Sequence, residues 1–137
     1  MEPKPDMINN MTCYKGSVEA WEIDHMGHMN VQFYLKKANH ALKLFFLKND
    51  INPNDILSFD ESFTLEQSHL RYLAEQKAGS PLFIDVGINS LCNNSFTLTM
   101  VMKELLSKEP SASFSLNFRI KEKKNKNIQN LLQRAYE

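Results

Sequence analysis

The longest helical pattern in the chain begins directly after Asn30 and continues to Lys48. Its apolar residues recur at spacings of three and four, with lysine and asparagine residues between them: Val31, Tyr34, Leu35, Ala38, Leu42, Phe45 and Phe46. This is the period of an amphipathic helix, here roughly 18 residues and about 27 Å long. Asn30 is placed to cap its start, and Asn49 and Asp50 mark its end. The pattern predicts one broad apolar helix face.

Shorter stretches alternate between apolar and polar positions, which is the period of a strand with one buried face. The first runs from Cys13 to Glu22, after a loose lead-in over residues 1–11. Four more follow the helix, with these apolar positions: Phe63, Leu65, Leu70 and Tyr72; Leu82, Ile84, Val86 and Ile88; Phe96, Leu98, Met100 and Met102; Ala112, Phe114, Leu116, Phe118 and Ile120. A change of phase near Gln67 and Ser68 indicates a bulge in the first of these four.

The links between the later strands are short and rich in turn-forming residues: Lys77–Pro81, Cys92–Asn94 and Ser107–Pro110. Such links favour antiparallel hairpins over crossover helices. Residues 49–61 predict a loop, and residues 121–137 predict a charged tail that could include a short helix. The economical packing is a single α+β domain over residues 1–137, in which an antiparallel sheet of about five strands is wrapped around one long central helix.

Composition and charge fit a globular domain and exclude several kinds of partner. The chain is 42% hydrophobic and 23% charged, and 16 basic residues balance 16 acidic ones. There is therefore no global attraction to nucleic acid or to an anionic membrane. The N-terminus lacks the pattern of a signal peptide, and no segment approaches the ~18 apolar residues of a membrane span. We expect a cytoplasmic protein that binds neither nucleic acid nor membrane.

The unusual chemistry of the chain is concentrated in the stretch WEIDHMGHMNVQFY, residues 21–34. It places a carboxylate and two imidazoles before a helix N-terminus, which offers unpaired backbone N–H groups and a partial positive charge. By themselves, Asp24 could be a turn or capping residue and His28 a structural histidine. Asp24, His25 and His28 could also supply three metal ligands, but no further ligands cluster with them, so we expect no metal.

Other enzyme classes lack their motifs in this sequence. There is no G-x-S-x-G elbow, no Walker loop and no G-x-G-x-x-G. An α/β-hydrolase, an NTPase and a Rossmann dehydrogenase are therefore not indicated.

The order of the predicted elements resembles the hotdog fold, and two motifs strengthen that resemblance. The spacing D-x-x-G-H-x-N-x-x-x-Y resembles hotdog thioesterases of the 4-hydroxybenzoyl-CoA type, in the subgroup that includes acyl-carrier-protein thioesterases and the betainyl-CoA thioesterase module associated with carnitine dehydrogenase. The matching residues are Asp24, Gly27, His28, Asn30 and Tyr34. A second block, residues 63–86, is similar to a strand pair of that subgroup, and its matching residues are Glu66, His69, Arg71, Tyr72 and Gly79.

The sequence also departs from this family pattern at two places. Plant acyl-carrier-protein thioesterases have an Asn where this chain has Met26, and many relatives carry an acid on the helix where residues 36–39 offer none. Two familiar catalytic helpers are therefore missing, and Asp24 has to carry more of any thioesterase mechanism.

The resemblance implies a hydrolase that cleaves an acyl-CoA to a free acid and CoA without a cofactor. Asp24 would attack the carbonyl or activate water, and backbone N–H groups of residues 30–32 would bind the oxyanion. Gly27 would permit a positive φ and close approach of the acyl chain. His28 could position the carbonyl, hydrogen-bond Asp24 or only pack the turn. The implied substrate contacts are Trp21, Gly27, Asn30, Val31, Tyr34, Glu66 and His69.

Several of these roles have alternatives. Glu66 and His69 could be solvated residues on an exposed strand face. Trp21 with Tyr34 or Tyr72 could form an aromatic wall for an acyl group, or a cage for a trimethylammonium group such as that of betaine. The resemblance further implies a homodimer or homotetramer built from paired sheets. The rival function is a non-catalytic hotdog protein that binds an acyl-CoA or a protein partner without turnover.

Overall fold

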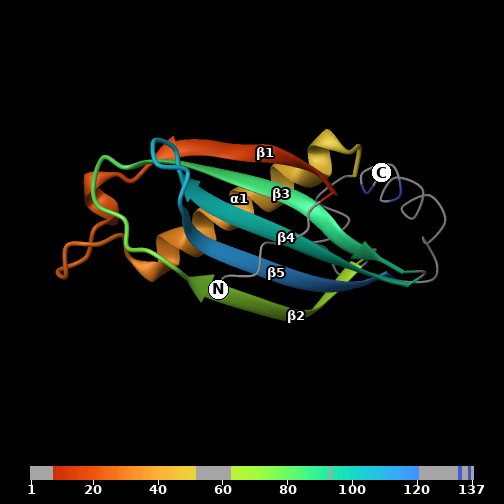
Figure 1. Cartoon of the computed structure of the whole chain (residues 1–137). Coiled ribbons are helices and arrows are strands. Elements are labelled where there is room, and N and C mark those ends of the chain that lie inside the picture. The colour runs from red at the N-terminus through yellow and green to blue at the C-terminus, as the bar shows by residue number, and fades with distance from the viewer. Residues whose placement is uncertain (1–7, 52–62, 93, 121–132, 134–135, 137) are drawn as a thin grey trace.

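The computed structural model describes residues 8–51, 63–92, 94–120, 133 and 136. These residues form a five-stranded antiparallel sheet, one 18-residue α-helix and a short 3-10 helix (Figure 1). The elements in chain order are β1 (Ile8–Ser17), η1 (Ala20–Glu22), α1 (Val31–Lys48), β2 (Phe63–Tyr72), β3 (Pro81–Leu91), β4 (Ser95–Glu104) and β5 (Pro110–Ile120).

Helix α1 has the bounds that its sequence pattern predicts. The Asn30 side chain caps it by accepting a hydrogen bond from the Gln32 backbone N–H at 3.1 Å. Buried positions along it include Ala38, Ala41, Phe45 and Phe46. Two apolar residues that were expected on the buried face are half exposed instead, Val31 at 54% and Leu35 at 46%. The helix packs mainly against β1 and β3, so the flank that carries Val31 and Leu35 is left open.

The strand order is β1-β3-β4-β5-β2, which puts β1 and β2 at opposite edges of the sheet (Figure 1). The expected β3–β4 and β4–β5 hairpins are confirmed. The expected hairpin between β2 and β3 is wrong, because β2 pairs with β5 and β3 pairs with β1. The link over residues 73–80 crosses the end of the sheet instead. It starts with Leu73 bonded to Ser111 of β5 and ends with Gly79 bonded to Val18, just after β1.

Strand β1 is displaced from its predicted position. It begins at Ile8, within the expected lead-in, and stops at Ser17, where it reaches the first residue of its partner β3 at Pro81. Beyond that point the chain has no strand to pair with, and it turns into η1, where the Glu19 N–H donates to the Glu22 carboxylate at 2.9 Å. Strand β2 has the bulge that its change of phase predicts, between Leu65 and Gln67.

The core lies between α1 and the inward face of the sheet. Its largest fully buried side chains are Phe45, Phe46, Phe96, Phe114, Ile51, Leu82, Ile84, Ile88, Leu98 and Met102. Tyr136 packs against this core, and Gln133 and Tyr136 are helical. The rest of the predicted tail and most of the loop over residues 49–61 lie outside the described residues. Within the described part, no helix is long and apolar enough to cross a membrane.

Candidate active site

The residues between η1 and α1 form a tight turn that presents Asp24. Its base is a bridge between Ile23 and Met29, and the Gly27 N–H donates to the Asp24 carbonyl at 3.0 Å. The Asp24 carboxylate accepts the Met26 N–H through Oδ1 at 2.9 Å, and its other oxygen has no hydrogen bond to the described residues. Gly27 has a φ of 87° and open space where a Cβ would lie, so backbone conformation and not crowding favours glycine here.

Backbone hydrogen bonds fix this turn against its neighbours. The Asn30 N–H donates to the Glu22 carbonyl at 2.9 Å, and the Met29 N–H donates to the Gln76 carbonyl at 2.8 Å. The turn is therefore held between η1, the start of α1 and the link that follows β2.

The start of α1 leaves one backbone donor open. The Asn30 N–H is engaged by Glu22, and the Gln32 N–H is engaged by the Asn30 side chain. Among the described residues, the Val31 N–H has no such partner. Of the three N–H groups that the sequence suggests for an oxyanion, the geometry therefore leaves that of Val31 available.

Asp24, His28, Val31 and Tyr34 line one depression of about 450 Å³ in front of α1. Residues from the end of β2 and the link after it complete the wall: Tyr72, Leu73, Ala74 and Glu75. We call this the Asp24 depression. It brings together a carboxylate, an imidazole and the start of a helix, as the sequence predicts.

Glu75, which no sequence motif singled out, contacts His28. The His28 Nε2 atom lies 3.0 Å from a Glu75 carboxylate oxygen, an ion pair when His28 is protonated. The His28 backbone carbonyl accepts from the Asp24 N–H at 3.0 Å, so His28 touches Asp24 through the backbone. The only signal for Glu75 in the sequence was its place inside the second family-like block, three residues after Tyr72.

Tyr34 is nearly buried and its hydroxyl is fixed. It donates to the Ala74 carbonyl at 3.2 Å, and its ring meets the Tyr72 ring edge-on with centroids 5.2 Å apart. Burial raises the pKa of Tyr34 above its ordinary value, and the nearby charge of Glu75 adds to the increase. The phenol therefore stays protonated and keeps its donor role at neutral pH.

Three of the predicted substrate contacts lie away from this depression, and Gly27 and Asn30, in the adjoining turn and cap, are not among the residues that line it. Trp21 is 69% exposed and packs edge-on against Phe33, with ring centroids 5.4 Å apart. It does not join Tyr34 or Tyr72 in an aromatic wall. Glu66 pairs with Arg119 at 2.6 Å, and His69 lies opposite Ser115 on β5. Strand β2 directs Glu66 and His69 away from α1, on the opposite face to Leu70. No group of three potential metal ligands occurs in the part of the chain that the structure describes.

A family model described as the thioesterase-like superfamily matches residues 18–126. The chain belongs to this superfamily. The match includes the turn, helix α1 and strands β2 to β5, so the Asp24 depression lies within the part of the chain that the family model matches. The sequence has no significant match among curated proteins.

Solved structures similar to this thioesterase-like chain share its fold at low sequence identity. A 1,4-dihydroxy-2-naphthoyl-CoA thioesterase from Synechocystis is 15% identical, with a TM-score of 0.73 over 90% of this chain and 96% of that one. A hypothetical protein from Staphylococcus aureus in complex with CoA is 12% identical, with a TM-score of 0.75 over 93% and 85%. A 4-hydroxybenzoyl CoA thioesterase mutant complexed with 4-hydroxybenzoyl CoA is 11% identical, with a TM-score of 0.69 over 82% and 84%. The sheet and helix α1 thus have the fold of these hotdog thioesterase structures.

Behind the site of this thioesterase-like protein lies a buried ion pair that the sequence pattern did not suggest. Lys37 and Glu22 are 7% and 4% exposed, and their charged atoms are 3.0 Å apart. The Lys37 ammonium also donates to the Tyr14 hydroxyl at 3.0 Å and to the Ser17 carbonyl at 3.3 Å. Burial acts to lower the pKa of Lys37, but the hydrogen bonds to Tyr14 and Glu22 outweigh it and the pKa is raised. The pair ties α1 to β1 and η1.

Replacing Lys37 by Met should lower the free energy of unfolding by about 3–5 kcal/mol, because Glu22 would remain buried without its partner. Urea denaturation at pH 7 measures this loss. Lys43→Met, at an exposed position of the same helix, is the matched control and should change stability by less than about 0.5 kcal/mol.

The loss should also depend on pH in a defined direction. A lysine whose pKa is raised by folding stabilises the protein fully below its unfolded pKa of about 10.4. That contribution is lost as the pH rises through the higher folded value. The difference between wild type and Lys37→Met should therefore hold from pH 7 to 9 and shrink only in stronger alkali. Equal stability of the Lys37 and Lys43 variants would show that the pair contributes nothing.

Proposed function

We propose that this chain hydrolyses an acyl-CoA thioester to a free acid and CoA, with the Asp24 depression as its active site. One observation carries the proposal. In a thioesterase-like chain, Asp24 and Val31, whose backbone N–H has no partner among the described residues, line the same depression. A carboxylate and a fixed donor are what thioester hydrolysis needs.

The chemistry can be assigned to these two groups. Asp24 either attacks the thioester carbonyl or takes a proton from the water that attacks it. The Met26 N–H holds Oδ1 of Asp24, so the other oxygen is the reactive one. The Val31 N–H binds the oxyanion of the tetrahedral intermediate, and the positive end of α1 favours the same charge. When Asp24 acts as the base, the proton that it took from water passes to the CoA sulfur as the C–S bond breaks, and the free acid is left. When Asp24 attacks, breaking the C–S bond releases CoA, whose sulfur takes a proton from solvent, and leaves an acyl–Asp24 anhydride. Water then hydrolyses this anhydride to the acid and restores the Asp24 carboxylate.

Neighbouring polar groups have supporting roles in this proposal. His28, held at Nε2 by Glu75, helps to position the thioester carbonyl. The buried Tyr34 hydroxyl fixes the wall formed by the link after β2. Asn30 acts as the helix cap that keeps the first turn of α1 in place. No step requires a cofactor.

We also propose a homodimer or homotetramer of single-domain subunits. Strand β2 is an edge strand whose residues 65–69 are exposed, and an exposed edge of this kind can be extended by another sheet. Such pairing would place a second subunit beside the Tyr72 side of the Asp24 depression.

A panel of short, long, aromatic and betainyl CoA esters, followed by release of free thiol, tests the function. We expect at least one ester to be turned over catalytically. A binding measurement with a non-hydrolysable alkyl-CoA thioether should accompany the panel. Tight binding of the thioether with no turnover of any ester would favour the rival function, a non-catalytic acyl-CoA-binding hotdog protein.

A further inference from the structure

We infer that the acyl group of the substrate is a long apolar chain, held in a groove between α1 and β2 that continues the Asp24 depression. This assignment of a substrate class depends on the thioesterase function proposed above.

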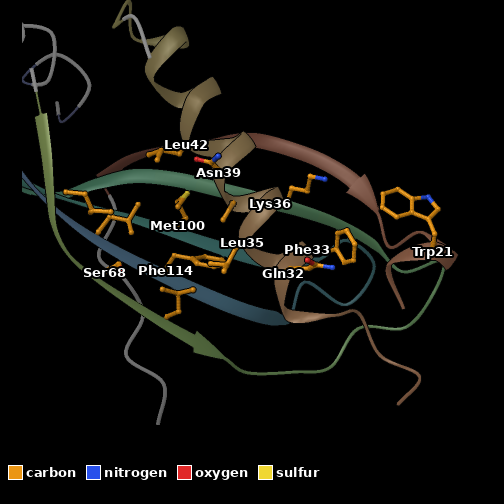
Figure 2. A pocket seen from close by; sticks show the side chains of 14 residues that line it. Trp21, Gln32, Phe33, Leu35, Lys36, Asn39, Leu42, Ser68, Met100 and Phe114 are labelled. Carbon is orange, nitrogen blue, oxygen red and sulfur yellow. The ribbon is translucent and has the colours of Figure 1, made fainter. Parts of the chain in front are cut away.

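The groove has a volume of about 760 Å³ and lies along the open flank of α1. Leu35 and Leu42 line it from the helix, Leu65 and Leu70 from β2, and Met100 and Phe114 from the floor of the sheet. Figure 2 shows Leu35, Met100 and Phe114 between the helix and the sheet, with Trp21 and Phe33 at the end nearest the helix start. The volume falls within the ~300–1,000 Å³ that is usual for small-molecule sites.

The groove exists because α1 packs against β1 and β3 and leaves the β2 side of the sheet uncovered. Large apolar side chains remain open there, with Leu65 at 50% and Leu35 at 46% exposure. Leaving such side chains in water is unfavourable, and an apolar ligand would remove them from it.

The groove and the Asp24 depression lie along the same line between α1 and β2. On α1, Val31 lines the depression, and Leu35, Ala38 and Leu42 line the groove. These four residues are spaced by four, three and four positions, so they form one stripe along the helix, about 17 Å long.

Strand β2 provides the opposite wall in the same order. Tyr72 lines the depression, while Leu70 and Ser68, on the same face of the strand, line the groove. The edge-on pair of Tyr34 and Tyr72 lines the depression, and each of the two is followed or preceded within two residues by a groove residue, Leu35 and Leu70. A thioester carbonyl at Asp24 and Val31 would therefore direct its acyl chain past this pair and along the groove.

The side chains that line the groove indicate which kind of acyl group it binds. Lys36 is its only ionisable side chain among the described residues, and its ammonium lies near the Phe33 ring, 5.9 Å from the centroid. The remaining polar residues, Gln32, Asn39 and Ser68, are exposed. A chain of methylene groups suits this surface, and each methylene that is fully buried should tighten binding by about fourfold.

The test is a series of saturated acyl-CoAs from acetyl to palmitoyl, followed by thiol release. With the wild-type protein, kcat/KM should rise with chain length, by up to about fourfold per methylene, and then level off. Ser68→Trp places a large side chain in the groove, and its matched control is Gln67→Trp, on the same strand with its side chain bonded to Asn117. Ser68→Trp should lose at least tenfold with long esters and little with acetyl-CoA, and Gln67→Trp should follow the wild type.

A second variant tests the groove in case Ser68→Trp does not fold. Leu35→Glu puts a charge into the groove at a half-exposed helix position, where a helix-forming residue is tolerated. It should show the same selective loss. Equal loss with short and long esters, together with a change of oligomeric state in gel filtration, would show instead that a second copy of the chain fills the groove and would overturn the inference.

Failure of the inference and failure of the proposed function give different results. Hydrolysis without any chain-length preference would overturn the role of the groove in binding the acyl chain. It would leave the proposed thioesterase function in place. If no ester is hydrolysed, the affinities of the protein for dodecyl-CoA and butyl-CoA thioethers should be compared by calorimetry. Tighter binding of the dodecyl compound, lost in Ser68→Trp, supports the groove without catalysis, and equal binding overturns it.

Discussion

An Asp24→Asn variant should hydrolyse acyl-CoA esters at least about 100-fold more slowly than the wild-type protein. The amide has the size of the carboxylate, and its carbonyl can still accept the Met26 N–H that holds the turn. It can neither attack a carbonyl nor take a proton from water. The loss should therefore appear in kcat, measured at saturating ester by thiol release, while binding of an alkyl-CoA thioether stays close to that of the wild type.

Asp50→Asn is the matched control for this substitution. Asp50 follows the C-terminal end of α1 with a φ of 63°, a conformation that Asn adopts readily, and it lies at the far end of the helix from the site. Its kcat should be unchanged. If Asp24→Asn remained as active as Asp50→Asn, Asp24 would have no catalytic role, and the proposed mechanism would be wrong.

Val31→Pro should lower the rate about 10²–10³-fold, the usual effect of removing one oxyanion donor. Proline is well suited to the first position of a helix, where the lost N–H has no helical partner. Asn30 already has φ −65° and ψ 144°, the extended conformation that a following proline requires. The substitution should therefore remove the donor and leave the cap and the fold in place.

Val31→Ala separates the backbone effect from the side-chain effect. Val31→Ala removes the apolar side chain and keeps the N–H. The hydrolysis rates of Val31→Pro and Val31→Ala should therefore differ by most of the loss of about 10²–10³-fold. Urea denaturation should give similar midpoints for both. Equal activity of Val31→Pro and Val31→Ala would exclude the Val31 N–H as the oxyanion donor.

The parts of the fold that depend on local chemistry could be predicted from the sequence. The bounds of α1 follow from a 3.6-residue period and from the Asn30 cap, both of which act over a few residues. The bulge in β2 likewise follows from a change of phase near Gln67. Strand partners are different, because a turn-rich link such as residues 73–80 shows that the chain reverses without showing which strand it meets.

The candidate site likewise has one part that could be predicted from the sequence and one part that could not. Asp24, His28, Val31 and Tyr34 are close in sequence, and the turn and the helix bring them to one depression. The positions of Glu66 and His69 depended on which face of β2 turns toward α1, and a bulged strand leaves that open. Lys37 stands among polar helix positions, so only the tertiary contact with Glu22 reveals that it is buried.

The strand order has a consequence for how the chain folds. Each edge strand pairs with a strand that is synthesised later, β1 with β3 and β2 with β5. The hairpins β3–β4 and β4–β5 need only short loops to close and can form early, whereas the edge strands require long-range closure. The turn that carries Asp24 is bonded to the link between β2 and β3, so we expect the candidate site to be assembled only in the last steps of folding, after β5 has left the ribosome.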